Sequence, residues 1–138
     1  MSHFSVAPDV FEALPQYCLG VAAATGVDNR TPNAGIAARL DQAVQDFAAA
    51  NAGVNLRELP GIRACREAFQ ALGMNPNKFL CSIEALLSRI AKKKGFPTIN
   101  PIVDLGNAVS LEHFLPIGAH DLGTIPEGLE VRPAVEGD

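Results

Sequence analysis

Near its middle the chain reads Gly61-Ile-Arg-Ala-Cys-Arg-Glu-Ala-Phe-Gln-Ala-Leu-Gly73, and its apolar residues recur with a helical period. These residues are Ile62, Cys65, Phe69 and Leu72, which follow one another at steps of three, four and three. Residues so spaced share one face of an α-helix, and a glycine such as Gly73 is common just past a helix end. The stretch therefore predicts an amphipathic helix over about 61–72, in which Cys65 is a buried and inert thiol.

Three further helices are predicted around this one. Apolar residues at steps of four, four and three, set among many alanines, predict a helix over about 33–52. Another helix is expected to begin with Ser82 as its N-cap and to end in Lys92-Lys-Lys-Gly95, where Gly95 is the cap. Asn100-Pro101 opens a short apolar helix that runs towards Leu111.

Strands are predicted on both sides of the helical region. The continuous run of small and apolar residues over 17–25 predicts a buried strand, and residues 129–132 predict a second one. The mixed pattern indicates an α+β fold. A length of 138 residues with 48% hydrophobic residues favours one domain over 1–138.

Composition excludes several classes of protein. No apolar run approaches the roughly 20 residues that cross a bilayer, and the start of the chain does not resemble a secretory signal. The three cysteines are far apart and form no Cys-x-x-Cys motif, which argues against a disulfide scaffold and a zinc site. We therefore expect a cytoplasmic protein with free thiols, without a metal or cofactor and without a membrane partner.

The net charge of −4 argues against a generic nucleic-acid binder, but the charges are segregated. Residues 61–95 carry net +5, whereas 1–60 carry −3 and 96–138 carry −6. The basic residues of the middle segment are Arg63, Arg66, Lys78, Arg89, Lys92, Lys93 and Lys94. The lysine triplet has two interpretations: it complements the dipole at a helix end, or it binds phosphate.

The stretch Leu115-Pro-Ile-Gly-Ala-His-Asp121 carries the densest set of chemically active residues. His120 and Asp121 could act as a base and the group that orients it, although neighbours in sequence often point apart. No nucleophile motif, phosphate loop or metal-binding histidine spacing accompanies them.

Four blocks of the sequence resemble the B3/B4 domain of the phenylalanyl-tRNA synthetase β chain, and more closely the free-standing B3/B4-domain proteins. The blocks are Arg66-Glu-Ala-Phe-Gln-Ala-Leu-Gly73, Ser82-Ile-Glu-Ala-Leu-Leu-Ser-Arg89, residues 96–111 and Leu115-Pro-Ile-Gly-Ala-His-Asp121. The resemblance covers about 57–134. It implies an α+β, three-layer fold with helices packed on a β-sheet, of which the C-terminal strands would be missing from this chain.

The resemblance also implies a candidate editing pocket. The family's Thr-Asn pair corresponds to Gly106 and Asn107, and the pocket histidine of its Pro-x-His turn corresponds to Gly118. Asp121 matches the aspartate of that turn, and His120 stands two residues after the histidine position. Asn107, His120 and Asp121 are the candidate catalytic residues, and amides near Gly106 and Gly118 could hold a carbonyl oxygen.

Three functions stay open on this basis. The first is an RNA-binding module, with tRNA as the expected ligand and the seven basic residues as phosphate contacts. The second is a hydrolase that deacylates mischarged aminoacyl-tRNA. The third is a non-catalytic structural or partner-binding remnant; bare sheet edges would then favour association, for example as a homo-oligomer.

Overall fold

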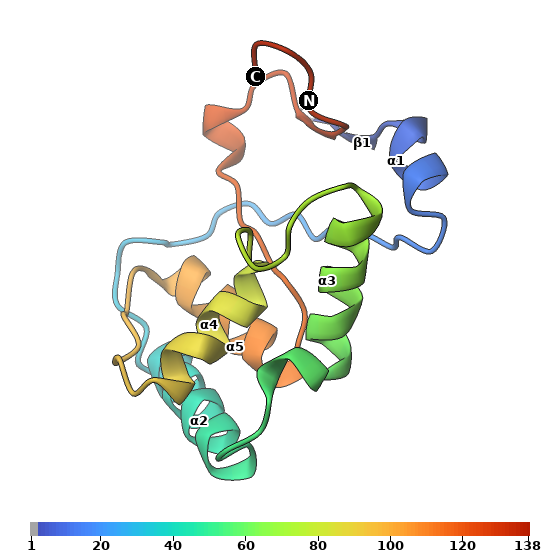
Figure 1. Cartoon of the computed structure of the whole chain (residues 1–138). Helices are drawn as coiled ribbons and strands as arrows, with labels where there is room; N and C mark the ends of the chain where they lie inside the picture. The colour runs from blue at the N-terminus through green and yellow to red at the C-terminus, as the bar shows by residue number, and fades with distance from the viewer. Residues whose placement is uncertain (1–2) are drawn as a thin grey trace. The chain divides into compact units, whose positions relative to one another are not determined.

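The computed structural model describes residues 3–138, which form two compact units (Figure 1). The helical unit comprises Thr25–Ala119. The terminal unit joins the first segment of the chain, up to Ala24, with His120–Asp138. The single domain over 1–138 stays a prediction.

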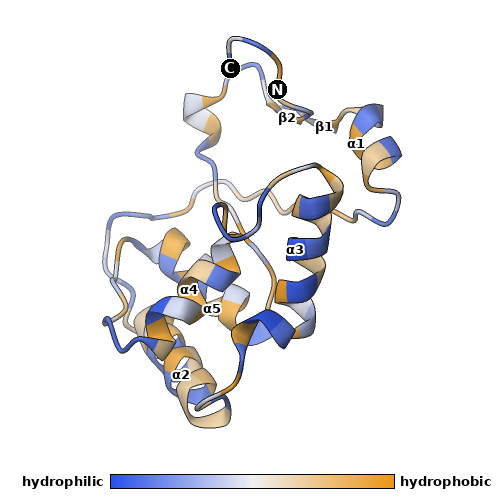
Figure 2. Ribbon diagram, viewed as in Figure 1, coloured by the Kyte–Doolittle hydropathy of each residue, from blue (hydrophilic) through white to orange (hydrophobic). Residues whose placement is uncertain are grey.

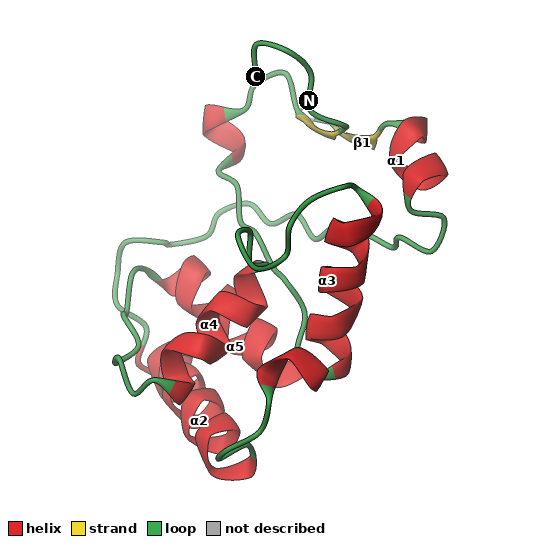
Figure 3. Ribbon diagram, viewed as in Figure 1, coloured by secondary structure: helices red, strands yellow, loops and turns green. Residues whose placement is uncertain are grey.

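Four α-helices build the helical unit (Figure 3). They are α2 (Ala34–Ala50), α3 (Pro60–Ala71), α4 (Ser82–Ala91) and α5 (Pro101–His113), with the 3-10 turn η1 (Leu56–Glu58) before α3. These bounds confirm the four predicted helices. Helix α2 packs along α5, and Arg39 of α2 donates two hydrogen bonds of 2.8 and 2.6 Å to the carboxylate of Glu112.

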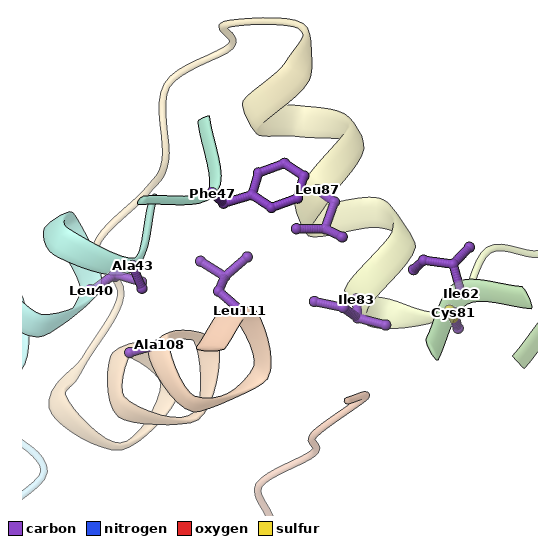
Figure 4. Packing of buried hydrophobic residues seen from close by; sticks show 9 residues of the cluster. All are labelled: Leu40, Ala43, Phe47, Ile62, Cys81, Ile83, Leu87, Ala108 and Leu111. Atoms are coloured by element: carbon purple, nitrogen blue, oxygen red, sulfur yellow. The ribbon is translucent and has the colours of Figure 1, made fainter. Parts of the chain in front are cut away.

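The buried core lies in the helical unit (Figure 4). Its members come from α2, α3, α4 with its N-cap, and α5: Leu40, Ala43, Phe47, Ile62, Cys81, Ile83, Leu87, Ala108 and Leu111. Figure 2 shows hydrophobic and hydrophilic residues alternating along α3 and α4, as the helical spacing predicts. The aromatic rings of Phe47 and Phe114 meet edge to face at 6.1 Å, which closes the core at the end of α5.

The ends of the helices agree with the prediction at α3 and differ at α4. Gly73 follows α3 with φ of +74°, and its N–H donates to the carbonyl of Gln70 at 2.9 Å. Helix α4 ends at Ala91 with Lys92 as its C-cap and Lys93 next in the left-handed conformation, with φ of +52°, so the prediction of Gly95 as the cap is wrong. The N-cap of α4 is Cys81 and not the predicted Ser82, because the helix begins one residue earlier than expected.

The terminal unit contains the sheet of the described residues, a pair of short parallel strands. Strand β1 (Phe4–Val6) pairs with β2 (Leu129–Val131), so that Phe4 lies opposite Leu129. The short helix α1 (Pro8–Ala13) follows β1, and the 3-10 turn η2 (Leu122–Thr124) precedes β2. Strand β2 confirms the prediction at 129–132, whereas the sequence pattern missed β1 and α1.

The predicted buried strand over 17–25 is wrong. These residues form no regular secondary structure, and Leu19 and Val21 are exposed. A strand is stable only when a neighbour pairs with its backbone N–H and C=O groups. None of the described residues provides that neighbour here, since the sheet consists of β1 and β2.

Helices and a parallel two-stranded sheet occur together, which is compatible with the α+β class. The three-layer arrangement stays a prediction. Within the described residues 3–138, no helix is both long and apolar enough to cross a membrane.

Candidate nucleic-acid interface

A hollow of about 370 Å³ opens on the helical unit along α4. Its walls come from η1, from the loop before α4 and from α4 itself. The polar residues that line it are Asn55, Arg57, Asn77, Glu84, Ser88 and Lys92, and the apolar ones are Val54, Leu56 and Leu80. The hollow thus combines two cations, four further polar groups and a partly apolar wall.

Local capping positions Arg57 at this hollow. The side chain of Asn55 accepts a hydrogen bond from the amide of Arg57 at 3.2 Å, which opens the η1 turn. The amide group of Asn55 also donates to Glu58 at 3.0 Å. An asparagine at this position favours a tight turn because its side chain replaces a backbone acceptor. Arg57 was not among the predicted phosphate contacts, since it lies outside the basic segment 61–95.

An inner ion pair supports the hollow. Arg66 of α3 donates to Glu84 of α4 at 2.9 Å, and these two side chains are only 14% and 7% exposed. The same guanidinium donates to the carbonyl of Pro76 at 2.9 Å and to Asn77 at 2.6 Å. Its positive charge is therefore paired inside the protein. Among the seven predicted phosphate contacts, Arg66 is the residue whose side chain joins α3 to α4.

The other predicted cations lie at the surface, and they differ in the neighbouring groups that they contact. Arg63 is 3.7 Å from Glu67 in an exposed pair, and Arg89 donates to the carbonyl of Gly95 at 2.7 Å. Lys78 stacks over the ring of Phe79, 5.4 Å from its centre. The lysine triplet at 92–94 is exposed at the end of α4, and Lys92 reaches the hollow.

The segregation of charge follows the two units. The helical unit has ten basic and eight acidic side chains, net +2, whereas the sequence of the terminal unit has one basic and seven acidic ones, net −6. All of the basic segment 61–95 belongs to the helical unit. An anionic ligand is therefore favoured by the helical unit and disfavoured by the terminal one.

The residues predicted for catalysis are divided between the units. Asn107 and Gly106 lie half-buried on α5, where a Cβ at Gly106 would be 3.6 Å from Ile117. Gly118 is exposed in the same unit. His120 and Asp121 are exposed in the terminal unit, and Asp121 accepts a hydrogen bond from Gly123 at 2.8 Å as the cap of η2. Their catalytic role stays a prediction.

None of these five residues lines either of the two described hollows. The second hollow, of about 300 Å³, lies between α2 and the end of α5, and its charged residues Asp46 and Glu112 are acidic. Among the residues that the structure describes, no three histidine, cysteine or acidic side chains are grouped as metal ligands would be.

Two cysteines that the sequence pattern treated separately affect each other's pKa. The thiol of Cys65, acting as a hydrogen-bond donor, lowers the pKa of Cys81. The same interaction, followed by burial, raises the pKa of Cys65. The residues are sixteen positions apart, so no motif in the sequence signals the pair.

Comparisons with known proteins give one match. The family model described as the B3/4 domain matches residues 64–138, more than half of the chain. Searches of curated proteins and of solved structures found no match to it.

Proposed function

The chain belongs to the B3/4 domain family, and on that premise we propose that it is an RNA-binding domain whose ligand is tRNA. The observation that carries the proposal is the hollow beside α4, which Arg57 and Lys92 both line in the basic unit of an otherwise acidic chain. The cytoplasm, where we expect the protein to act, is part of the same proposal.

Phosphate groups would bind at the cationic edge of the hollow. Lys92 lines it, and Lys93 and Lys94 continue the positive charge from the last turn of α4. Lysine is a flexible point charge and therefore suits contacts with the backbone of a nucleic acid rather than recognition of a particular base. Such contacts give an affinity that falls steeply with salt.

A sugar or an unstacked base would fit the inner part of the hollow. Its volume of about 370 Å³ lies within the roughly 300–1,000 Å³ of small-ligand pockets. Leu56 and Leu80 provide apolar surface, while the side chains of Asn77 and Ser88 offer hydrogen bonds. RNA is recognised mainly at unpaired bases, which can enter hollows of this kind.

A titration of fluorescent tRNA at low salt, followed by anisotropy, tests the proposal. Lys92→Ala should weaken binding and reduce the slope of log affinity against log salt by about 1, because one phosphate contact is lost. Arg30→Ala is the matched control: it removes one exposed positive charge from the same unit but lies outside the hollow. Its affinity and slope should stay those of the parent chain.

Two results would overturn the proposal. One is the absence of binding by the parent chain at tens of micromolar protein in low salt. The other is an equal loss of affinity in Lys92→Ala and Arg30→Ala, because the net charge of the unit would then account for binding and the hollow would have no part in it.

A further inference from the structure

The thiols of Cys65 and Cys81 are brought together at one end of the core. Cys65 lies on α3 one turn after Ile62, on the same face of the helix, and packs against the buried cluster. Ile62 and Cys81 are both members of that cluster and lie at the same end of it (Figure 4). The packing of α3 against the start of α4 therefore sets the two cysteines side by side.

Neighbouring contacts hold this arrangement in place. Arg66, next to Cys65, reaches Glu84 at 2.9 Å, and Glu84 lies in the first turn of the helix that Cys81 caps. Arg66 also donates to the carbonyl of Pro76, in the loop between the two helices. Both cysteines thus lie within three residues of the side chains that join α3 to α4.

The two thiols differ in chemistry. Cys81 is the N-cap of a ten-residue helix, where the backbone N–H groups and the helix dipole favour a thiolate. Its side chain makes no cap hydrogen bond of normal geometry, but the thiol of Cys65 and, to a smaller extent, the amide of Glu84 lower its pKa. Cys65 is the proton donor of the pair, and its pKa is raised. One member is therefore a nucleophile and the other a protonated neighbour.

We propose that Cys65 and Cys81 form a modification site, at which a hydroperoxide oxidises the pair to an intrachain disulfide. The proposal is independent of RNA binding. The third cysteine, Cys18, is exposed in the terminal unit and takes no part.

The reaction balances in two steps. The thiolate of Cys81 attacks one peroxide oxygen and the O–O bond breaks, which gives a sulfenic acid on Cys81 and hydroxide or alkoxide as leaving group. The sulfur of Cys65 then loses its proton, attacks the sulfur of Cys81 and displaces hydroxide as the S–O bond breaks. With hydrogen peroxide, the two thiols supply two electrons and two protons, and two water molecules are the products.

A small oxidant can approach the site from the hollow beside α4. Leu80 and Glu84, on either side of Cys81 in the sequence, line that hollow. Cys81 is 8% exposed, and Cys65 is half-buried. Hydrogen peroxide is little larger than water, so local fluctuation at the edge of the hollow is enough for access, whereas bulky reagents are excluded.

The test uses the full chain carrying Cys18→Ser, which leaves the pair as the only thiols. After hydrogen peroxide treatment, free thiols should fall from two per chain to none, and the intact mass should decrease by two hydrogen atoms. Trypsin should release residues 64–66 joined to 79–89, and dithiothreitol should separate them. The oxidised chain should also unfold at a higher urea concentration, because the bond closes a loop in the unfolded state.

The matched control is Cys65→Ser in the parent chain, which also has two thiols, Cys18 and Cys81, but not the adjacent pair. It should form no intrachain disulfide, and dimedone should trap the sulfenic acid on Cys81. The proposal is overturned if the Cys18→Ser chain keeps both thiols or forms only cross-linked dimers. It is equally overturned if the control closes an intrachain Cys18–Cys81 disulfide as fast.

Discussion

Replacement of Arg66 by alanine tests whether the inner ion pair holds α3 against α4. Arg66 makes hydrogen bonds to Glu84, Pro76 and Asn77, and its side chain is 14% exposed. Removal of one member of a buried ion pair costs about 3–5 kcal/mol, because the other charge is left without its partner. Glu84 borders the open hollow, where water can solvate part of its charge. We therefore expect the lower end, ~3 kcal/mol.

Urea unfolding followed by far-UV circular dichroism measures this loss. With a slope of roughly 1 kcal/mol per molar urea, the midpoint should fall by about 3 M. The control Arg63→Ala removes the same side chain one turn earlier on α3, where the pair with Glu67 is 3.7 Å long and 67% exposed on both sides. An exposed pair of this spacing contributes only about 0.3–0.5 kcal/mol. The urea midpoint of Arg63→Ala should therefore barely move.

Equal midpoints for Arg66→Ala and Arg63→Ala would refute this reasoning, because burial would then have no influence on the strength of the pair. The double variant with Glu84→Gln gives a second check. Once the carboxylate is neutral, loss of Arg66 leaves no unpaired charge. The losses of unfolding free energy in Arg66→Ala and in Glu84→Gln should therefore sum to more than the loss in the double variant.

Two further changes test the backbone. Gly61→Ala would place a Cβ 2.3 Å from the carbonyl oxygen of Phe114, and the forced shift should cost about 2–3 kcal/mol in thermal unfolding. Gly20→Ala, where nothing lies within 4 Å, is its control, and an equal loss in both would contradict the close approach. Lys93→Gly should raise stability by about 0.5–1 kcal/mol in urea unfolding, because the left-handed conformation costs a lysine more than a glycine. An unchanged or lower midpoint would show that Lys93 is not strained.

The helical unit was largely predictable because its signals are local. Helix α2 was expected over about 33–52 and spans Ala34–Ala50, and α3 was expected over 61–72 and spans Pro60–Ala71. A helix satisfies its own backbone hydrogen bonds, so spacing and end residues suffice to locate it. The segment 17–25 had an equally clear apolar run, but a strand depends on a partner that its own sequence does not contain.

The site was predictable in its charge and not in its geometry. The basic segment 61–95 was visible in the sequence, yet the inner role of Arg66 and the place of Arg57 at the hollow were not. Nothing in the sequence pattern identifies Glu84 as the buried partner of a side chain eighteen positions away. Such a pairing depends on how two helices cross.

The sequence by itself determined where the helices lie, where positive charge is concentrated and which family the chain resembles, since all three are carried by residues close together along the chain. The tertiary structure alone decided that Arg66 faces inward and that Cys65 meets Cys81. Helix spacing places a residue on a face, but the partner of that face is set by the packing of the whole core, in which α2, α3, α4 and α5 bury their apolar sides together.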